Sequence, residues 1–110
     1  MLVPNAHLAA IAKDKIVRYL LNPEHTRGGS KARVLLSFGY NAAEWGDLAD
    51  DLRDFHLTSD YSLARESDYG TRYEIRAPLK TPDGRELTVR SIWQIDIGQN
   101  KPRFITLFPN

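Results

Sequence analysis

The chain has 110 residues, 42% of them hydrophobic, and a formal net charge of +1, which predicts a single domain over residues 1–110. It contains no cysteine, which excludes disulfide scaffolds, zinc–cysteine sites, iron–sulfur clusters and thiol catalysis. The low net charge and the 10% of aromatic residues exclude general disorder, and no apolar run is long enough to span a membrane.

The N-terminal residues have no basic region ahead of their apolar stretch, so they do not resemble a secretory signal. We therefore expect a cytoplasmic, bacterial-type protein, and a toxin domain exported by another route would look the same. The first helix is predicted over residues 15–21. Asp14 is its expected N-cap, and Asn22 and Pro23 are expected to end it.

Two further helices are predicted before residue 58. Ser30 is a typical cap for a helix over residues 31–38, which Gly39 would end. Asn41 is the expected cap of the third helix. His56 at its end is expected either to pair with the helix dipole or to contact the residue four positions earlier. The apolar stripe of this helix is Trp45, Leu48, Leu52 and Phe55. The acidic residues opposite are Glu44, Asp47, Asp50, Asp51 and Asp54.

From residue 58 onward, apolar and polar residues alternate, which is typical of strands. Strands are predicted over residues 72–79, 87–97 and 103–108, with a turn at 81–84 and an irregular first strand within 59–67. The expected fold is α+β, with N-terminal helices packed on one face of a C-terminal antiparallel β-meander of three to four strands. Alternation assigns Trp93, Ile95, Ile105 and Leu107 to the face under the helices.

The other face of the sheet is the expected substrate-binding surface. Arg72, Arg76, Arg90 and Thr106 alternate onto it. Because the net charge is only +1, RNA binding would depend on such a local concentration of positive charge. Tyr69, just before the first long strand, is a further candidate to contact substrate.

The loop between the first two helices is the strongest candidate for chemistry. It contains a histidine, His25, that titrates near neutral pH, and two cations, Arg27 and Lys31. Gly28 and Gly29 would let the backbone approach a ligand, and the following helix N-terminus favours an anion. This combination suits proton transfer beside a phosphate. The alternative is an ordinary surface loop with an exposed histidine.

No motif for nucleotide hydrolysis or zinc proteolysis is present. The three histidines, His7, His25 and His56, form no spacing typical of metal ligands. We therefore expect neither a metal nor another cofactor.

Short motifs are spread over nearly the whole chain. They include Tyr-Leu-Leu-Asn-Pro-Glu-His at 19–25, Gly-Ser-Lys-Ala-Arg at 29–33, Tyr-Gly-Thr-Arg-Tyr at 69–73 and Pro-Arg-Phe-Ile-Thr-Leu-Phe-Pro at 102–109. Together they resemble a family of unknown function that is associated with toxin systems and occurs in small bacterial proteins and as a C-terminal domain of larger ones.

A more distant similarity is to the superfamily that includes barnase, EndoU, colicin nucleases and RelE-type toxins. This resemblance implies a metal-independent ribonuclease, often a toxin held by an antitoxin or immunity protein. It implies that His25 is the general acid/base and that Lys31 stabilises the transition-state phosphate. It also implies that Thr106 orients the substrate or the scissile phosphate, with Arg90 as a second cation. The EndoU pattern has two histidines close together, whereas this loop has one, so Tyr69 or Lys31 would have to be its partner.

Two functions follow from these observations. The first is a metal-independent ribonuclease that cleaves RNA through a 2′,3′-cyclic phosphate. The second is a non-catalytic interaction module, an antitoxin- or immunity-like partner that uses its acidic helix face. Convergence of His25, Lys31 and Thr106 in one cleft would favour the enzyme, and their dispersion would favour the module.

Overall fold

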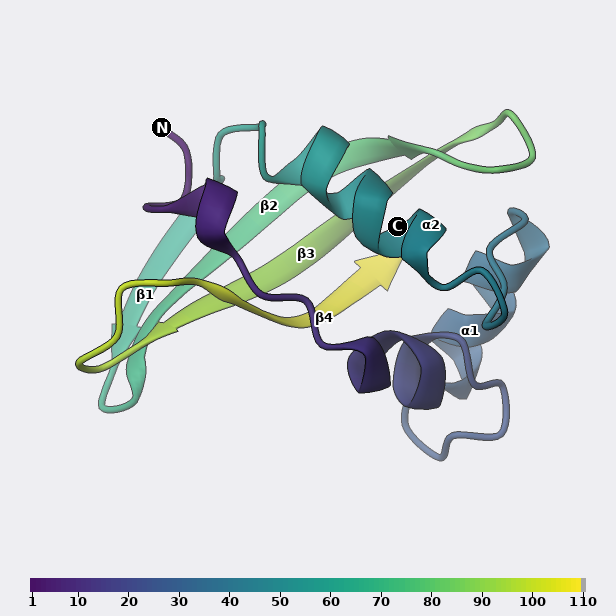
Figure 1. The fold of residues 1–110 in the computed structure, drawn as a ribbon, viewed down its shortest axis with the longest axis horizontal. Coiled ribbons are helices and arrows are strands. Elements are labelled where there is room, and N and C mark those ends of the chain that lie inside the picture. Colours follow the sequence, from purple (N-terminus) through teal and green to yellow (C-terminus); the bar gives the residue numbers. More distant parts are fainter. Residues whose placement is uncertain (110) are drawn as a thin grey trace.

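The computed structural model describes residues 1–109, in which helical segments precede one four-stranded sheet (Figure 1). The helical segments are η1 (Ala6–Leu8), η2 (Lys15–Leu20), α1 (Gly29–Ser37), α2 (Gly46–Asp51) and η3 (Leu52–His56). The strands are β1 (Leu63–Ser67), β2 (Gly70–Lys80), β3 (Glu86–Asp96) and β4 (Arg103–Pro109). All neighbouring strands are antiparallel, in the order β1-β2-β3-β4. The predicted α+β fold is confirmed, and within the described residues no helix is both long and apolar enough to cross a membrane.

The helical segments differ from the prediction in their caps and turns. The turns of η2 are wider than those of an α-helix, because the Leu21 N–H donates to the carbonyl of Ile16, five residues earlier, at 2.8 Å. Asp14 makes no side-chain capping bond. Helix α1 begins at Gly29, ahead of the expected Ser30 cap. The Glu44 N–H does donate to Asn41 Oδ1 at 2.8 Å, although the helix itself begins only at Gly46.

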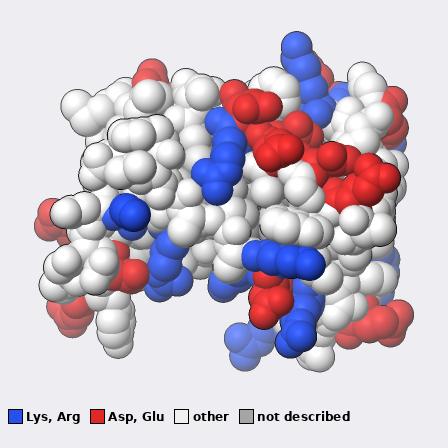
Figure 2. All heavy atoms as spheres, in the orientation of Figure 1, with Lys and Arg blue, Asp and Glu red and all other residues white. Residues whose placement is uncertain are grey.

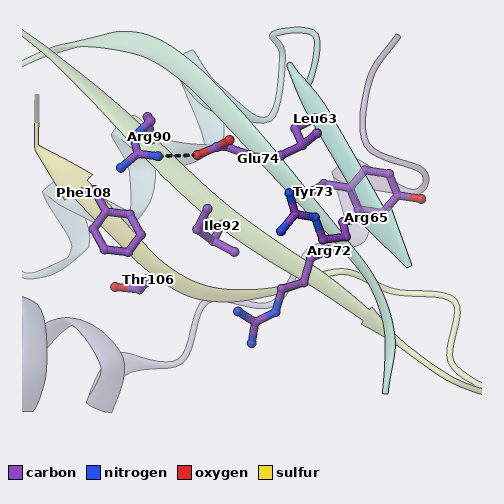
Figure 3. A pocket seen from close by; sticks show the side chains of 9 residues that line it. All are labelled: Leu63, Arg65, Arg72, Tyr73, Glu74, Arg90, Ile92, Thr106 and Phe108. Carbon is purple, nitrogen blue, oxygen red and sulfur yellow. Dashed lines mark hydrogen bonds and ion pairs between the residues drawn. The ribbon is translucent and has the colours of Figure 1, made fainter. Parts of the chain in front are cut away.

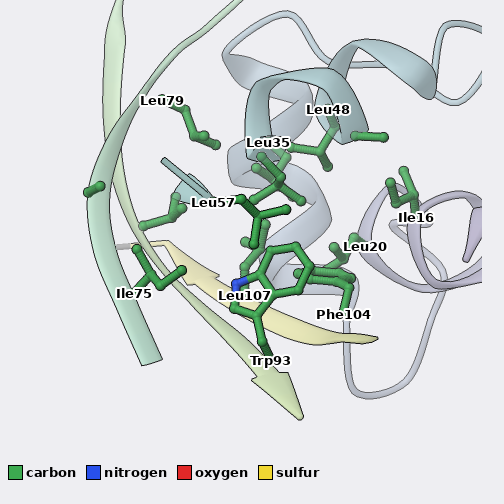
Figure 4. Close-up of a cluster of buried hydrophobic side chains, with 14 of the residues drawn as sticks. Ile16, Leu20, Leu35, Leu48, Leu57, Ile75, Leu79, Trp93, Phe104 and Leu107 are labelled. Carbon is green, nitrogen blue, oxygen red and sulfur yellow. The ribbon is translucent and has the colours of Figure 1, made fainter. Parts of the chain in front are cut away.

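The core lies between the helical segments and one face of the sheet (Figure 4). Trp93 is completely buried there, its indole Nε1 donates to Ser91 Oγ at 2.8 Å, and its ring meets that of Phe104 edge-on. Leu48 and Leu52 are also fully buried, as the apolar stripe predicts. The other members of the expected core are half-buried at its margin: Trp45, Phe55 and Ile95.

A β-bulge in β4 corrects the expected core pair on the last strand. Ile92 pairs with Thr106, but its neighbour Trp93 pairs with Phe104, so Ile105 is the extra residue. Phe104 is consequently buried where Ile105 was expected, and Ile105 is half-buried. Leu107 is fully buried as predicted, and Thr106 remains on the opposite face.

His56 is fully buried, so its predicted pairing with the helix dipole is wrong. Its Nδ1 lies 2.7 Å from Ser91 Oγ and its Nε2 lies 2.9 Å from the Ala77 carbonyl oxygen. A carbonyl only accepts hydrogen bonds, so the ring proton is on Nε2 and Nδ1 accepts from the Ser91 hydroxyl. Burial outweighs the hydrogen bond to Ala77 and lowers the pKa of His56 to about 4. The hydrogen bonds of this neutral histidine connect η3 to Ala77 in β2 and Ser91 in β3.

The free energy of unfolding is expected to fall as the pH is lowered through the range set by His56. The unfolded chain takes up this proton near pH ~6.5, and the folded chain only near pH 4. The unfolded state therefore binds more protons than the folded state between these pH values. This lowers the free energy of unfolding by up to roughly 3 kcal/mol. Urea unfolding at several pH values measures this loss. In His56→Gln the side-chain amide can still donate to the Ala77 carbonyl, and the pH dependence of the free energy of unfolding should become flatter. An equally steep fall in that variant would assign the effect to other groups.

Candidate functional site

A groove of about 390 Å³ lies on the face of the sheet opposite the core, which we call the open face (Figure 3). Cross-strand pairing places Glu74, Ile92 and Thr106 in one row across β2, β3 and β4, and Arg90 beside Phe108 in the next. The residues that line the groove are Leu63, Arg65, Arg72, Tyr73, Glu74, Arg90, Ile92, Thr106 and Phe108.

Three polar side chains from three elements meet at the β4 edge of this groove. Lys31 Nζ in α1 donates to the Tyr19 hydroxyl in η2 at 2.9 Å and to Thr106 Oγ1 in β4 at 3.1 Å. Thr106 Oγ1 also lies 3.4 Å from the Tyr19 hydroxyl. We call Tyr19, Lys31 and Thr106 the lysine cluster. Lys31 and Thr106 were expected as site residues but Tyr19 was not, because its only signal in the sequence is a phenol in η2, just before the loop.

The lysine cluster carries the positive charge of Lys31. None of the ion pairs found in residues 1–109 includes Lys31. Its Nζ lies 4.0 Å from the ring centre of Phe108, and the Arg90 guanidinium lies 5.0 Å from the same ring. Phe108 therefore holds two cations close together by cation–π contacts. Arg90 also pairs with Glu74, so Lys31 is the cation of the two that favours an anionic ligand.

Tyr19 is the titratable hydroxyl of the cluster. Burial raises the pKa of Tyr19, but hydrogen bonds from Lys31 and Thr106 and the positive charge of Lys31 outweigh burial and lower it overall. The phenolate form is thus stabilised at the edge of the groove. A phenolate beside an ammonium can accept a proton from a substrate hydroxyl.

His25 adjoins the cluster through Tyr19, and the two rings meet edge-on with centroids 4.9 Å apart. Its Nδ1 accepts the backbone N–H groups of Arg27 at 3.1 Å and Gly28 at 3.0 Å. The neutral ring therefore carries its proton on Nε2 and has no nitrogen lone pair left to accept another. His25 is half-buried rather than exposed, and its contacts order the loop.

The glycines of this loop serve packing within the protein. A Cβ at Gly28 would lie 2.8 Å from ring carbons of Tyr19, and one at Gly29 would lie 2.6 Å from the Pro23 carbonyl oxygen. Glycine thus allows the loop to close against Tyr19, whereas the sequence suggested close approach to a ligand. Arg27 is exposed in the same loop.

The arginines expected on the open face do lie there. Arg90 Nη1 forms an ion pair with Glu74 Oε1 at 2.8 Å, and Arg72 Nε donates to Gln94 Oε1 at 2.9 Å. Arg76 lies directly opposite Arg90 in the β2–β3 pairing and is exposed. Glu74 therefore neutralises Arg90, whereas Arg72 and Arg76 belong to none of the ion pairs found in residues 1–109.

Tyr69 lies at the other end of the sheet from the lysine cluster. It precedes Gly70, the first residue of β2. Glu74, which lies in the same cross-strand row as Thr106, is four residues further along β2. That separation is about 13 Å. Tyr69 is therefore too distant from the lysine cluster to take part in proton transfer beside Lys31 and Thr106.

Acidic side chains gather over a different part of the surface, near α2 (Figure 2). Asp47, Asp50 and Asp54 are exposed there, whereas Asp51 is half-buried and accepts the Tyr40 hydroxyl at 2.7 Å. Burial and the neighbouring carboxylates raise the pKa of Asp51. Among residues 1–109, histidines and carboxylates form no group of three or more that could hold a metal ion.

Comparison with known proteins identifies a family and a structural relative. The family described as "Domain of unknown function (DUF6883)" matches residues 2–110, and no curated protein matches the chain. A chain in the solved structure of a contact-dependent growth inhibition toxin–immunity protein complex from Klebsiella pneumoniae 342 is similar, with a TM-score of 0.72. The alignment covers 96% of this chain and 97% of that one at 16% sequence identity, so the likeness shows a shared fold.

Proposed function

We propose that this chain, which belongs to the DUF6883 family, is a metal-independent RNA endonuclease acting in a toxin system. The observation that carries the proposal is the lysine cluster, in which an ammonium that pairs with no carboxylate of residues 1–109 holds two hydroxyls at the edge of a cationic groove. The fold shared with a chain of a toxin–immunity complex supports the toxin context. A cognate antitoxin or immunity protein is the protein partner that this context implies.

The proposed reaction is attack of an RNA 2′-hydroxyl on the adjacent phosphorus. Tyr19 as phenolate takes the proton of the 2′-hydroxyl, the O2′–P bond forms, and the P–O5′ bond breaks. The departing O5′ takes a proton from water, which leaves a 2′,3′-cyclic phosphate and a 5′-hydroxyl. Lys31 stabilises the negative charge that develops on the phosphorane. Thr106 orients the phosphate, and the pair of cations around Phe108 brings Arg90 to the same region.

His25 takes a positioning role in this mechanism. Its Nδ1 is already occupied by two backbone N–H groups, so the neutral ring cannot act as the base. It can donate a hydrogen bond from Nε2, and its ring holds that of Tyr19. The acid/base role that the ribonuclease resemblance implies for His25 passes to Tyr19.

The proposed function is tested by removing the Tyr19 hydroxyl alone. Tyr19→Phe keeps the ring against His25 and should lower RNA cleavage in EDTA about 10²–10⁴-fold, the usual contribution of a general base. The matched control is Tyr61→Phe. It removes a hydroxyl that makes a weak contact, with its oxygen 3.7 Å from the Met1 sulfur. Equal cleavage by both variants and the unmodified protein would contradict the assignment.

A conservative variant separates positioning by His25 from proton transfer. His25→Ala should destabilise the protein by about 1–2 kcal/mol, because two backbone N–H groups lose their acceptor, and should lower cleavage. The side-chain oxygen of asparagine can accept such bonds in a turn. His25→Asn should therefore recover the melting temperature and raise cleavage above that of His25→Ala, while loss of the ring that contacts Tyr19 keeps it below that of the unmodified protein. A stable His25→Asn variant with no more cleavage than Tyr19→Phe would restore His25 to a direct role in proton transfer.

An immunity-like role is the second candidate, and the exposed carboxylates Asp47, Asp50 and Asp54 near α2 favour it. A protein of this kind would present its acidic surface to a basic partner. It would have no ribonuclease activity of its own, so the cleavage assay distinguishes the two functions.

A further inference from the structure

The open face has a second hollow, of about 500 Å³, next to the groove. It extends toward the β1–β2 hairpin and shares two lining residues with the groove, Arg65 and Arg72. Tyr69 and Arg103 line its far part. The two hollows therefore form one continuous strip from the lysine cluster to the hairpin.

The middle of this strip holds two like charges face to face. Arg65 in β1 and Arg72 in β2 are direct cross-strand partners, an arrangement that repulsion makes unfavourable without an anion. Neither belongs to any ion pair found in residues 1–109. Arg103, by contrast, is neutralised by Asp96 at 2.8 Å. Arg65 and Arg72 are thus the arginines of this part of the strip that are available to a phosphate.

Tyr69 exposes an aromatic ring beside these arginines. It is 78% exposed, yet its backbone is fixed: its N–H donates to Ser67 Oγ at 3.2 Å, and its carbonyl accepts the Ile97 N–H at 3.0 Å. An exposed aromatic ring on a fixed backbone next to cations is the combination that unpaired bases bind, by stacking while the phosphates are held.

We infer that the strip binds a single, unpaired RNA strand, with a phosphate between Arg65 and Arg72 and a base stacked on Tyr69. The inference rests on the proposed function and names its class of substrate. Tyr69 lies at least about 13 Å from the row of Thr106, so the strand must extend beyond the nucleotides at the scissile bond. Bases within a duplex are stacked on each other and are not available to Tyr69.

The test is a binding measurement that does not depend on cleavage. The probe is an unpaired RNA of about eight nucleotides with methylated 2′-hydroxyls, which cannot be cleaved by the proposed reaction, and fluorescence anisotropy reports its affinity. Tyr69→Ala should weaken binding about 5- to 100-fold through loss of stacking, whereas Tyr69→Phe should bind like the unmodified protein. Arg65→Ala should weaken binding and lower the salt dependence by the equivalent of about one phosphate contact.

The matched control for Arg65→Ala is Arg33→Ala, which removes an exposed arginine on α1. Arg33 lies two residues after Lys31, about 200° around the helix, and its loss should leave affinity unchanged. Unchanged binding by Tyr69→Ala, or equal affinity for a duplex of the same length, would overturn the inference even if the protein cleaves RNA. Probe binding that needs Tyr69, together with no cleavage of unmodified RNA, would instead retain the strip and reject the proposed nuclease function.

Discussion

Replacement of Lys31 with alanine is expected to lower the rate of RNA cleavage about 10²–10³-fold. In the proposed mechanism its ammonium stabilises the charged phosphorane, and in the structure it donates hydrogen bonds to both Tyr19 and Thr106. Lys31 also contributes to the lowered pKa of Tyr19. Cleavage by a Tyr19 phenolate should rise with pH as the phenolate forms, so in Lys31→Ala this rise should move to higher pH.

The pH profile makes this prediction specific. A variant that had merely lost stability would lower the rate at every pH and leave the position of the rise unchanged. Arg33→Ala removes a cation from the same helix and should keep both the rate and the profile. Loss of activity with an unmoved profile would mean that Lys31 does not act on Tyr19.

Replacement of Trp93 with alanine is expected to destabilise the fold by roughly 3–5 kcal/mol. The indole is fully buried, packs edge-on against Phe104, and donates to the Ser91 hydroxyl that His56 also contacts. Its removal therefore leaves a cavity and takes from Ser91 Oγ one of the hydrogen bonds that this buried oxygen accepts. Urea unfolding measures the loss, with Ile97→Ala as the control because Ile97 is 68% exposed. A loss for Trp93→Ala as small as that of the control would contradict the burial of this face.

Strand alternation predicted much of the sheet, because a strand with one buried face repeats every two residues. It identified the strands around Tyr73 and Trp93 and placed Leu107 in the core, in agreement with the structure. It failed at Ile105, because a bulge inserts one residue and reverses the order locally. The local sequence gives no sign of that insertion, which pairing with β3 determines.

The candidate site was only partly predictable for a similar reason. Lys31 could be identified from its charge, and Thr106 from its place on the last strand. Tyr19 joins them only because η2 and α1 both pack near β4, a contact between distant parts of the chain. The sequence also shows a histidine in a loop, but not that the loop's own N–H groups occupy its Nδ1. Likewise, the burial of His56 depends on Ala77 and Ser91 in two strands.

The role proposed for the lysine cluster is the activation of an RNA 2′-hydroxyl. It is tested by incubating the purified protein in EDTA with an unpaired RNA and with DNA of the same sequence, and by determining the ends of the products. RNA should be cleaved to 2′,3′-cyclic phosphate and 5′-hydroxyl ends while the DNA stays intact. If the RNA also stayed intact, or if both nucleic acids were cleaved, the lysine cluster would not have this role.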